Sequence, residues 1–168
     1  MSLENYLKKR NFEKTSEPKP ELTESFCEQI VEKYKGIKLK RPVYVIQEHH
    51  ASHLHWDLRL EINGVLKSWA IPKQPPTQPG IRRLAVQTED HPIEYACFEG
   101  TIPEGNYGAG EVIIWDKGTF KIESLKPEKI VFEIFGEKLK GKYVLVKLKS
   151  SPKFKGENNW LFFKKKEE

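Results

Sequence analysis

Hydrophobic and polar residues alternate along much of the chain after Pro42, which is the pattern of β-strands that bury one face. The clearest case is residues 54–62, LHWDLRLEI, where Trp56, Leu58 and Leu60 alternate with polar side chains. Asn63-Gly64 follows and is typical of a tight hairpin turn, so residues 65–71 are the expected return strand. Similar patterns predict further strands at residues 43–47, 83–87, 111–115, 119–124, 129–135, 142–149 and 160–163.

Turn-forming residues separate these strands. Asp116-Lys117-Gly118 predicts a second hairpin, and Glu89-Asp90-His91-Pro92 predicts a polar turn. Residues 100–110, GTIPEGNYGAG, predict a glycine-rich hairpin loop, since they lack the spacing of the known phosphate-binding loops. Many short strands joined by tight turns indicate a mainly β fold, an antiparallel barrel or sandwich with a few flanking helices.

Helical spacing occurs near the N-terminus. Phe26, Ile30, Val31 and Tyr34 lie on one face of a predicted amphipathic helix that Gly36 ends. We therefore expect an N-terminal arm and helix over residues 1–42 and a β core over residues 43–168, together forming one domain.

The composition of the 168 residues is that of a polar-surfaced globular protein, with 38% hydrophobic and 32% charged residues. No apolar run reaches the ~18 residues of a membrane span, and the N-terminus does not resemble a signal peptide. A cytoplasmic protein without membrane contact is the expectation. Cys27 and Cys97 are far apart and are expected to be reduced thiols.

Positive charge is concentrated at the C-terminus. Residues 137–168 hold ten lysines and four glutamates and so carry a net charge of +6. Residues 1–136 carry −1, which gives the whole chain its net charge of +5. Such a segment suits either a phosphate backbone or a solvated lysine-rich surface, and charge alone does not separate the two.

Residues 47–61, QEHHASHLHWDLRLE, contain four of the five histidines. On an extended strand His55 and Asp57 project from one face and can converge on one ion, with His49 as a third ligand across a bend. Two imidazoles and a carboxylate suit manganese, zinc or iron and leave open positions for water or substrate. His50 and His53 are expected to be peripheral, although alternation places His53 on the face of His55.

Arg59 continues this face, where its guanidinium fits a phosphate group. An ion pair with Glu61 or Glu89 is the structural alternative. His91 is a candidate general acid near neutral pH, and Tyr95 is a candidate hydrogen-bond donor to the same phosphate.

The segment QEHHASHLHWDLRLEINGVLKSWAIPKQP resembles the 3′-phosphoesterase domain of bacterial DNA ligase D. The segments RRLAVQTEDHPIEYACFEGTIPEGNYGAGEVIIWDKG, NNWLFFKK and YLKKRNFEKTSEP fit the same family. The resemblance implies a compact β barrel and a manganese-dependent enzyme, with zinc or cobalt as alternative ions. It also implies that a 3′-terminal ribonucleoside is removed from a DNA primer-template and that the remaining 3′-phosphate is then hydrolysed to a 3′-hydroxyl.

The resemblance also assigns roles to residues. It implies His49, His55 and Asp57 as metal ligands, and Arg59, His91 and Tyr95, with His55, as the groups around the phosphate. Supporting polar positions are implied for Arg10, Glu17, Gln47, Ser68, Lys73, Arg83 and Glu89.

Two features depart from the family pattern. Asn11 replaces the usual aspartate of the N-terminal arm, which removes a carboxylate, and residues 19–42 replace a glycine-rich lead with a helix-like segment. The sequence shows no ligase or polymerase domain, so a stand-alone member that works with a separate ligase or polymerase is expected.

Two other functions also fit parts of the sequence. A non-haem iron oxygenase would use His55, Asp57 and His91 as its two-histidine, one-carboxylate triad, but would leave His49 unused. A non-catalytic module that binds DNA ends would use the basic C-terminal segment, but would not need the metal ligands.

Overall fold

The computed structural model describes residues 42–153 and 156–166. The arm and helix expected over residues 1–42 lie almost wholly outside this part of the chain. The same holds for Arg10, Asn11, Glu17 and Cys27, whose expected roles stay predictions.

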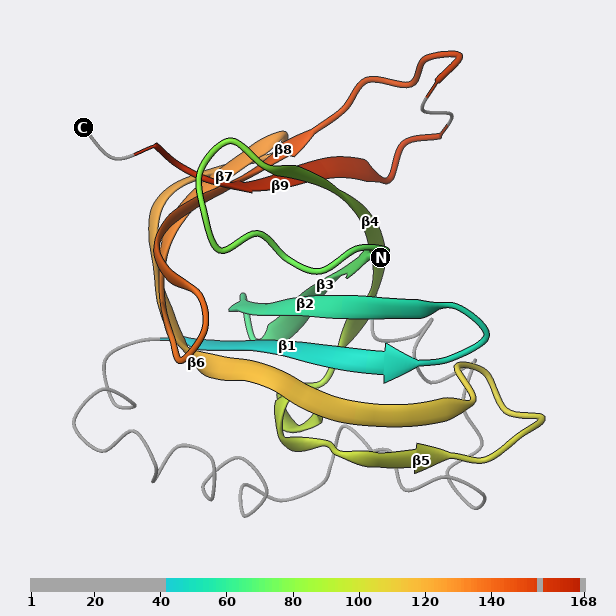
Figure 1. Cartoon of the computed structure of the whole chain (residues 1–168). Helices are drawn as coiled ribbons and strands as arrows, with labels where there is room; N and C mark the ends of the chain where they lie inside the picture. Colours follow the sequence, from blue (N-terminus) through green and yellow to red (C-terminus); the bar gives the residue numbers. More distant parts are fainter. Residues whose placement is uncertain (1–41, 154–155, 167–168) are drawn as a thin grey trace.

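Eight antiparallel strands close into a barrel, in the order β1-β2-β3-β4-β9-β8-β7-β6, with β6 returning to β1 (Figure 1). The expected mainly β barrel is therefore confirmed. A ninth strand, β5, extends the sheet beyond β6. The strands are β1 Val43–His50, β2 Leu54–Ile62, β3 Val65–Ile71, β4 Arg82–His91, β5 Gly100–Ile102, β6 Gly110–Lys126, β7 Lys129–Gly136, β8 Lys140–Lys147 and β9 Asn159–Lys164.

The interior of the barrel is filled by large apolar side chains, to which all eight barrel strands contribute. On β2 these are the alternating residues that the sequence pattern marks as buried, and Leu58 and Leu60 have no exposed surface. The predicted Asn63-Gly64 hairpin joins β2 to β3, with both residues at positive φ. The loop of residues 72–81 is tied to the barrel where the Tyr143 hydroxyl donates to the Pro76 carbonyl at 2.8 Å.

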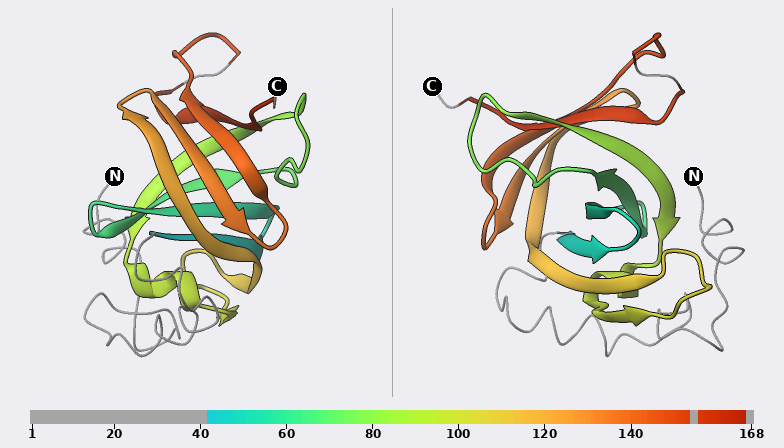
Figure 2. Two further views of the ribbon diagram at one scale, coloured as in Figure 1. Left: turned by 90° about the vertical axis from the view of Figure 1, so that its left-hand side faces the viewer. Right: turned by 45° about the vertical axis from the view of Figure 1, so that its right-hand side comes forward.

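A second, smaller apolar cluster lies on the outer face of the barrel wall. It joins Val45 of β1 and Leu66 of β3 to residues from the segment between β4 and β6. That segment contains η1 (Ile93–Cys97), a 3₁₀ helix and the one helical element in the described residues, followed by β5. Figure 2 shows both elements outside the barrel, against the wall. The outer face of β1–β4 is thus partly covered and forms a recess.

The predicted hairpin at Asp116-Lys117-Gly118 is wrong, because β6 runs unbroken through these residues. A bulge opposite Ile46 and Gln47 bends the strand, and β6 pairs with β1 before it and with both β1 and β7 after it. The features that suggested a turn have other causes. A Cβ at Gly118 would lie 2.1 Å from the Phe135 carbonyl oxygen, so glycine permits close backbone approach here.

Asp116 does not turn its own strand but holds the turn between β7 and β8. Its buried carboxylate accepts hydrogen bonds from the Tyr44 hydroxyl at 2.8 Å and from the backbone N–H groups of residues 137, 138 and 139 at 2.8–2.9 Å. A turn-forming residue in the sequence therefore acts on a turn about twenty residues away.

The predicted turn at residues 89–92 is also wrong. β4 continues to His91, and the chain turns only at Pro92 and η1. A bulge between the Leu66–His91 and Ser68–Thr88 pairs places one extra β4 residue opposite β3. This bulge brings Thr88 and His91, three positions apart, to the same outer face.

In the described residues no helix has the length and apolar character needed to cross a membrane.

Candidate active site

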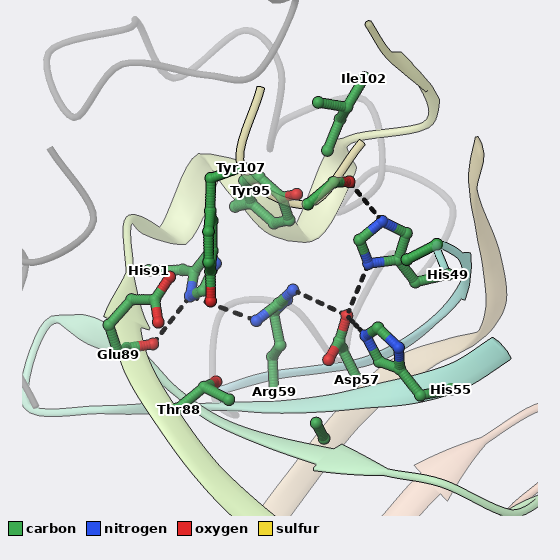
Figure 3. A pocket seen from close by; sticks show the side chains of 13 residues that line it. His49, His55, Asp57, Arg59, Thr88, Glu89, His91, Tyr95, Ile102 and Tyr107 are labelled. Carbon is green, nitrogen blue, oxygen red and sulfur yellow. Dashed lines mark hydrogen bonds and ion pairs between the residues drawn. The ribbon is translucent and has the colours of Figure 1, made fainter. Parts of the chain in front are cut away.

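A pocket of about 260 Å³ lies on the outer face of β1–β4, beneath η1 and the loop of residues 103–109. Figure 3 shows its polar side chains pointing toward one another across the recess. Its lining residues are His49, Ala51, His55, Asp57, Arg59, Ala70, Thr88, Glu89, His91, Tyr95, Ile102, Tyr107 and Gly108.

One wall of the pocket carries a group suited to a metal ion. His49 and His55 are cross-strand partners of β1 and β2, and Asp57 follows on the same face of β2. One ligand atom from each of the three lies within 4.8 Å of the others. Asp57 Oδ2 is 3.6 Å from His49 Nδ1 and 3.2 Å from His55 Nε2. The hairpin geometry thus brings together the three residues that the sequence suggested as ligands.

Backbone carbonyls fix both imidazoles for this arrangement. The Gly108 carbonyl lies 2.7 Å from His49 Nε2, and the His53 carbonyl lies 3.1 Å from His55 Nδ1. Because a carbonyl only accepts, each of these nitrogens carries its proton. In its neutral form each ring would turn an unprotonated nitrogen toward the Asp57 carboxylate. Lone pairs facing a carboxylate need a cation between them, so the donor set fits a divalent metal such as Mn²⁺.

Charge in the site agrees with this fit. Burial raises the pKa of Asp57, but the Arg59 guanidinium and the contacts with His49 and His55 outweigh it and hold the pKa well below its usual range. Burial lowers the pKa of His55, but the hydrogen bond and charge of Asp57 outweigh it and raise the pKa above the ordinary value. The Asp57 carboxylate thus favours positive charge at this group, such as a proton on His55 or a bound cation.

Arg59 lies beside the metal group and is almost completely buried. Its Nη2 is 3.4 Å from Asp57 Oδ2, and its guanidinium carbon is 4.7 Å from the centre of the Tyr95 ring. The structural alternative, an ion pair with Glu61 or Glu89, is not what holds it, because its close ionic partner is Asp57 and Glu61 bonds to the Val43 backbone. The cation is thus fixed at the floor of the pocket.

Gln47 holds Arg59 in this position. Its Oε1 accepts a hydrogen bond from Arg59 Nε at 2.6 Å, and its Nε2 donates to the carbonyls of Tyr95 and Phe98 at 2.8 and 3.0 Å. Gln47 has no exposed surface. A single amide therefore joins the wall of the barrel, the guanidinium and η1.

His91 lines the side of the pocket opposite the metal group. Its Nδ1 is 2.9 Å from the Glu89 carbonyl and 3.3 Å from Ser68 Oγ. The carbonyl places the proton on Nδ1, so the Arg59 nitrogen at 3.2 Å is a contact and not a donor to a lone pair. Nε2 is the remaining ring nitrogen. Tyr95 of η1 packs edge-on against His91, with ring centroids 4.7 Å apart.

Several residues named from the sequence lie away from the pocket. Lys73 is exposed in the loop after β3, and Arg83 donates from Nε to the Gln74 carbonyl at 2.9 Å. His50 is exposed and pairs with Glu48 at 2.7 Å, and the side chain of His53 is exposed too. The pocket lining spans residues 49–108, so the basic C-terminal lysines are not part of it.

Six lining residues were not found from the sequence: Ala51, Ala70, Thr88, Ile102, Tyr107 and Gly108. Thr88 reaches the pocket because of the β4 bulge, which the local hydrophobic pattern of the sequence does not predict. Tyr107 and Gly108 belong to the glycine-rich loop, whose expected hairpin form is confirmed by the pairing of β5 with β6. An aromatic residue within that loop was the available signal.

Comparison with known proteins identifies the family of the chain. Residues 47–147 match the family model of the DNA ligase D 3′-phosphoesterase domain. The chain is 40% identical to the multifunctional non-homologous end joining protein LigD of Pseudomonas aeruginosa over 98% of its length, and 42% identical to the LigD DNA repair protein of Mycobacterium tuberculosis over 86%. Identity to LigD of Mycolicibacterium smegmatis is 46% over 74% of the chain.

The pocket, barrel and matches together define a phosphoesterase domain. The chain belongs to the DNA ligase D 3′-phosphoesterase domain family. It spans about a fifth of the length of the curated relatives, since the matched regions cover 19%, 18% and 17% of the three proteins.

Proposed function

We propose that this chain is a divalent-metal-dependent phosphoesterase that processes DNA 3′ ends. In the proposed reaction it removes a terminal ribonucleoside as a phosphodiesterase and then the remaining 3′-phosphate as a phosphomonoesterase, leaving a 3′-hydroxyl. The observation that carries the proposal is a metal-type His-His-Asp group beside the buried Arg59, in a pocket of about 260 Å³. The end-joining names of the relatives point to DNA ends as the substrate.

The proposed metal ligands are His49 Nδ1, His55 Nε2 and the Asp57 carboxylate. Mn²⁺ is the proposed ion, with Zn²⁺ or Co²⁺ as alternatives, because imidazole and carboxylate ligands suit all three. Bound there, the ion would polarise a phosphoryl oxygen and offset negative charge that develops in the transition state. Three protein ligands leave coordination positions for water and substrate.

Arg59 is the proposed phosphate clamp. Its Nε is used by Gln47, so the two terminal nitrogens are the ones that point toward the pocket space between Asp57 and His91 (Figure 3). A guanidinium held in place before substrate arrives loses little freedom on binding and needs no rearrangement during the reaction. Its cation–π contact with the Tyr95 ring further restrains the guanidinium.

His91 in its imidazolium form is the proposed proton donor: Nε2 gives its proton to the departing oxygen while the Nδ1 proton stays bonded to the Glu89 carbonyl. The Glu89 carbonyl and Ser68 hydroxyl support this assignment, because they engage Nδ1 and fix the orientation of the ring. Tyr95 lines the same side of the pocket and is the proposed second donor to the phosphate. Hydrogen bonding by Nε2 to a non-bridging oxygen would stabilise the transition state instead, and the two roles differ in which step suffers when His91 is lost.

An iron oxygenase remains the rival chemistry for a two-histidine, one-carboxylate group. The grouping in the structure uses His49 in place of His91, contrary to the triad expected for that rival. Arg59 also places a positive charge 3.4 Å from the carboxylate, which suits an anionic substrate better than a neutral one. The family membership supports the phosphoesterase as well.

A labelled DNA primer-template with one 3′ ribonucleotide tests the proposal. With manganese, we expect a 3′-phosphate end to appear first and a 3′-hydroxyl end to follow, and chelator is expected to abolish both. His49→Ala, His55→Ala or Asp57→Ala is expected to abolish both steps. His50→Ala, which removes a neighbouring exposed imidazole, is the matched control and should keep them.

His91→Ala is expected to slow release of the 3′-phosphate at least as much as the diesterase step. Metal-dependent turnover that survives in Asp57→Ala would refute the ligand assignment. Consumption of 2-oxoglutarate with iron(II), without phosphate chemistry, would favour the oxygenase. Tight binding of DNA ends with no product would favour a binding module.

We propose that the new 3′-hydroxyl is used by a DNA ligase or polymerase.

A further inference from the structure

The pocket is small for a site that would enclose a whole nucleotide. Its volume of about 260 Å³ lies below the roughly 300–1,000 Å³ of sites that enclose drug-sized ligands. If the phosphate occupies the space between Asp57, Arg59 and His91, the nucleoside attached to it must lie at the mouth. The inference that follows rests on the proposed function and concerns what the mouth offers to that nucleoside.

Tyr107 lies at this mouth. It lines the pocket although 49% of its surface is exposed. Figure 3 shows its side chain extending over the pocket toward His91 and Arg59. The other strongly exposed large apolar residues of the described chain are aliphatic: Leu54, Ile81, Ile113 and Leu125. An exposed aromatic ring is thus present where the substrate must leave the pocket.

The loop that carries Tyr107 is held by one contact to β1 and by one turn within the loop. The Gly108 carbonyl binds His49 Nε2 at 2.7 Å, and the Asn106 backbone N–H donates to the Pro103 carbonyl at 3.3 Å. Gly108 has a φ of 75°, a conformation that favours glycine. The adjacent anchor ties the ring to a proposed metal ligand, so its position relative to the phosphate site is set before substrate binds.

We infer that Tyr107 is a substrate-contacting residue on which the base of the nucleoside attached to the scissile phosphate stacks. Every base offers a π face, so such a contact recognises a nucleoside without selecting its sequence. The phosphate would be held by the metal group and Arg59, and the base by the ring at the mouth. Recognition of a nucleic-acid end would then need only one nucleotide.

The test uses the full chain with manganese and compares kcat/KM for wild type, Tyr107→Phe and Tyr107→Ala. The substrates are primer ends with a 3′ ribonucleotide in three forms: intact, abasic at the terminal position and abasic at the penultimate position. On the intact end, Tyr107→Ala is expected to lose about tenfold to 100-fold, the range of one base–aromatic stack, and Tyr107→Phe to stay within about twofold. Leu125→Ala, equally exposed but outside the pocket, should behave as wild type.

The abasic ends separate stacking from other roles. At one of the two positions, removing the base is expected to lower wild-type activity to that of Tyr107→Ala, and the substitution should then have little further effect. Full activity of Tyr107→Ala would overturn the inference, as would equal losses in Phe and Ala or the same loss on every substrate. No turnover of any end by wild type would refute the proposed function and the inference together, whereas wild-type turnover that ignores Tyr107 refutes the inference alone.

Discussion

Gln47 gives the sharpest test of how the site is held, because it makes three hydrogen bonds from a fully buried position. Gln47→Leu keeps a similar size but removes all three. Two backbone carbonyls and the Arg59 Nε–H would be left buried without that partner, at about 1–3 kcal/mol each. The added apolar burial returns part of this cost, so we expect unfolding to become easier by about 3–5 kcal/mol.

The same substitution is expected to lower kcat/KM by at least about tenfold, because Arg59 loses the group that orients it. Urea unfolding gives the stability change, and primer-end cleavage gives the activity. Gln87→Leu is the matched control, since Gln87 lies outside the pocket and accepts one hydrogen bond, from Trp160 Nε1 at 3.2 Å. It should cost about 1 kcal/mol and leave kcat/KM unchanged. A loss under about 1 kcal/mol in Gln47→Leu, with full activity, would refute the reasoning.

The site and the barrel give two further predictions. Because the pKa of His55 is raised, protons compete with the metal for this side chain, and the affinity for Mn²⁺ should rise with pH through that pKa and then level off. The metal-free protein should lose folding stability as the pH rises from about 6.5, because the stabilising proton on His55 is then lost. Manganese titrations and melting curves in chelator check both, and a metal affinity independent of pH would contradict the first. Asp116→Asn should destabilise the protein by about 2–4 kcal/mol, since one carboxylate oxygen that accepts two N–H groups is lost. Metal affinity should stay unchanged, and weaker metal binding in the folded variant would contradict the view that the β7–β8 turn and the pocket are independent.

Local patterns were sufficient where one strand face is buried and the other is not. In residues 54–62 the period of two separates the core residues from His55, Asp57 and Arg59, and the Asn63-Gly64 turn sets the register with β3. His49 was expected near His55 across a bend, and the β1–β2 register shows instead that the two are direct cross-strand partners. The metal group was therefore within reach of sequence reasoning because it lies on a single hairpin.

Patterns failed where the backbone departs from regular pairing. The β4 bulge uses turn-forming residues inside a strand, so Thr88 and His91 share a face that alternation does not predict. Gly118 allows close contact between strands, and Asp116 stabilises a turn elsewhere, so neither marks the local hairpin that their residue types suggested. These roles depend on partners distant in sequence. The link between Gly108 and His49 is of the same kind.

β2 carries core residues and site residues in strict alternation, and this restricts how its length can change during evolution. Inserting or deleting one residue within Leu54–Ile62 would turn Leu58 and Leu60 outward and Asp57 and Arg59 into the barrel, so a single event would damage stability and chemistry together. Length changes in residues 148–153 after β8, which do not line the pocket, would spare both. Among homologous sequences, gaps should therefore be absent from β2 and accumulate in the connecting loops, while substitutions on either face of β2 change one property at a time.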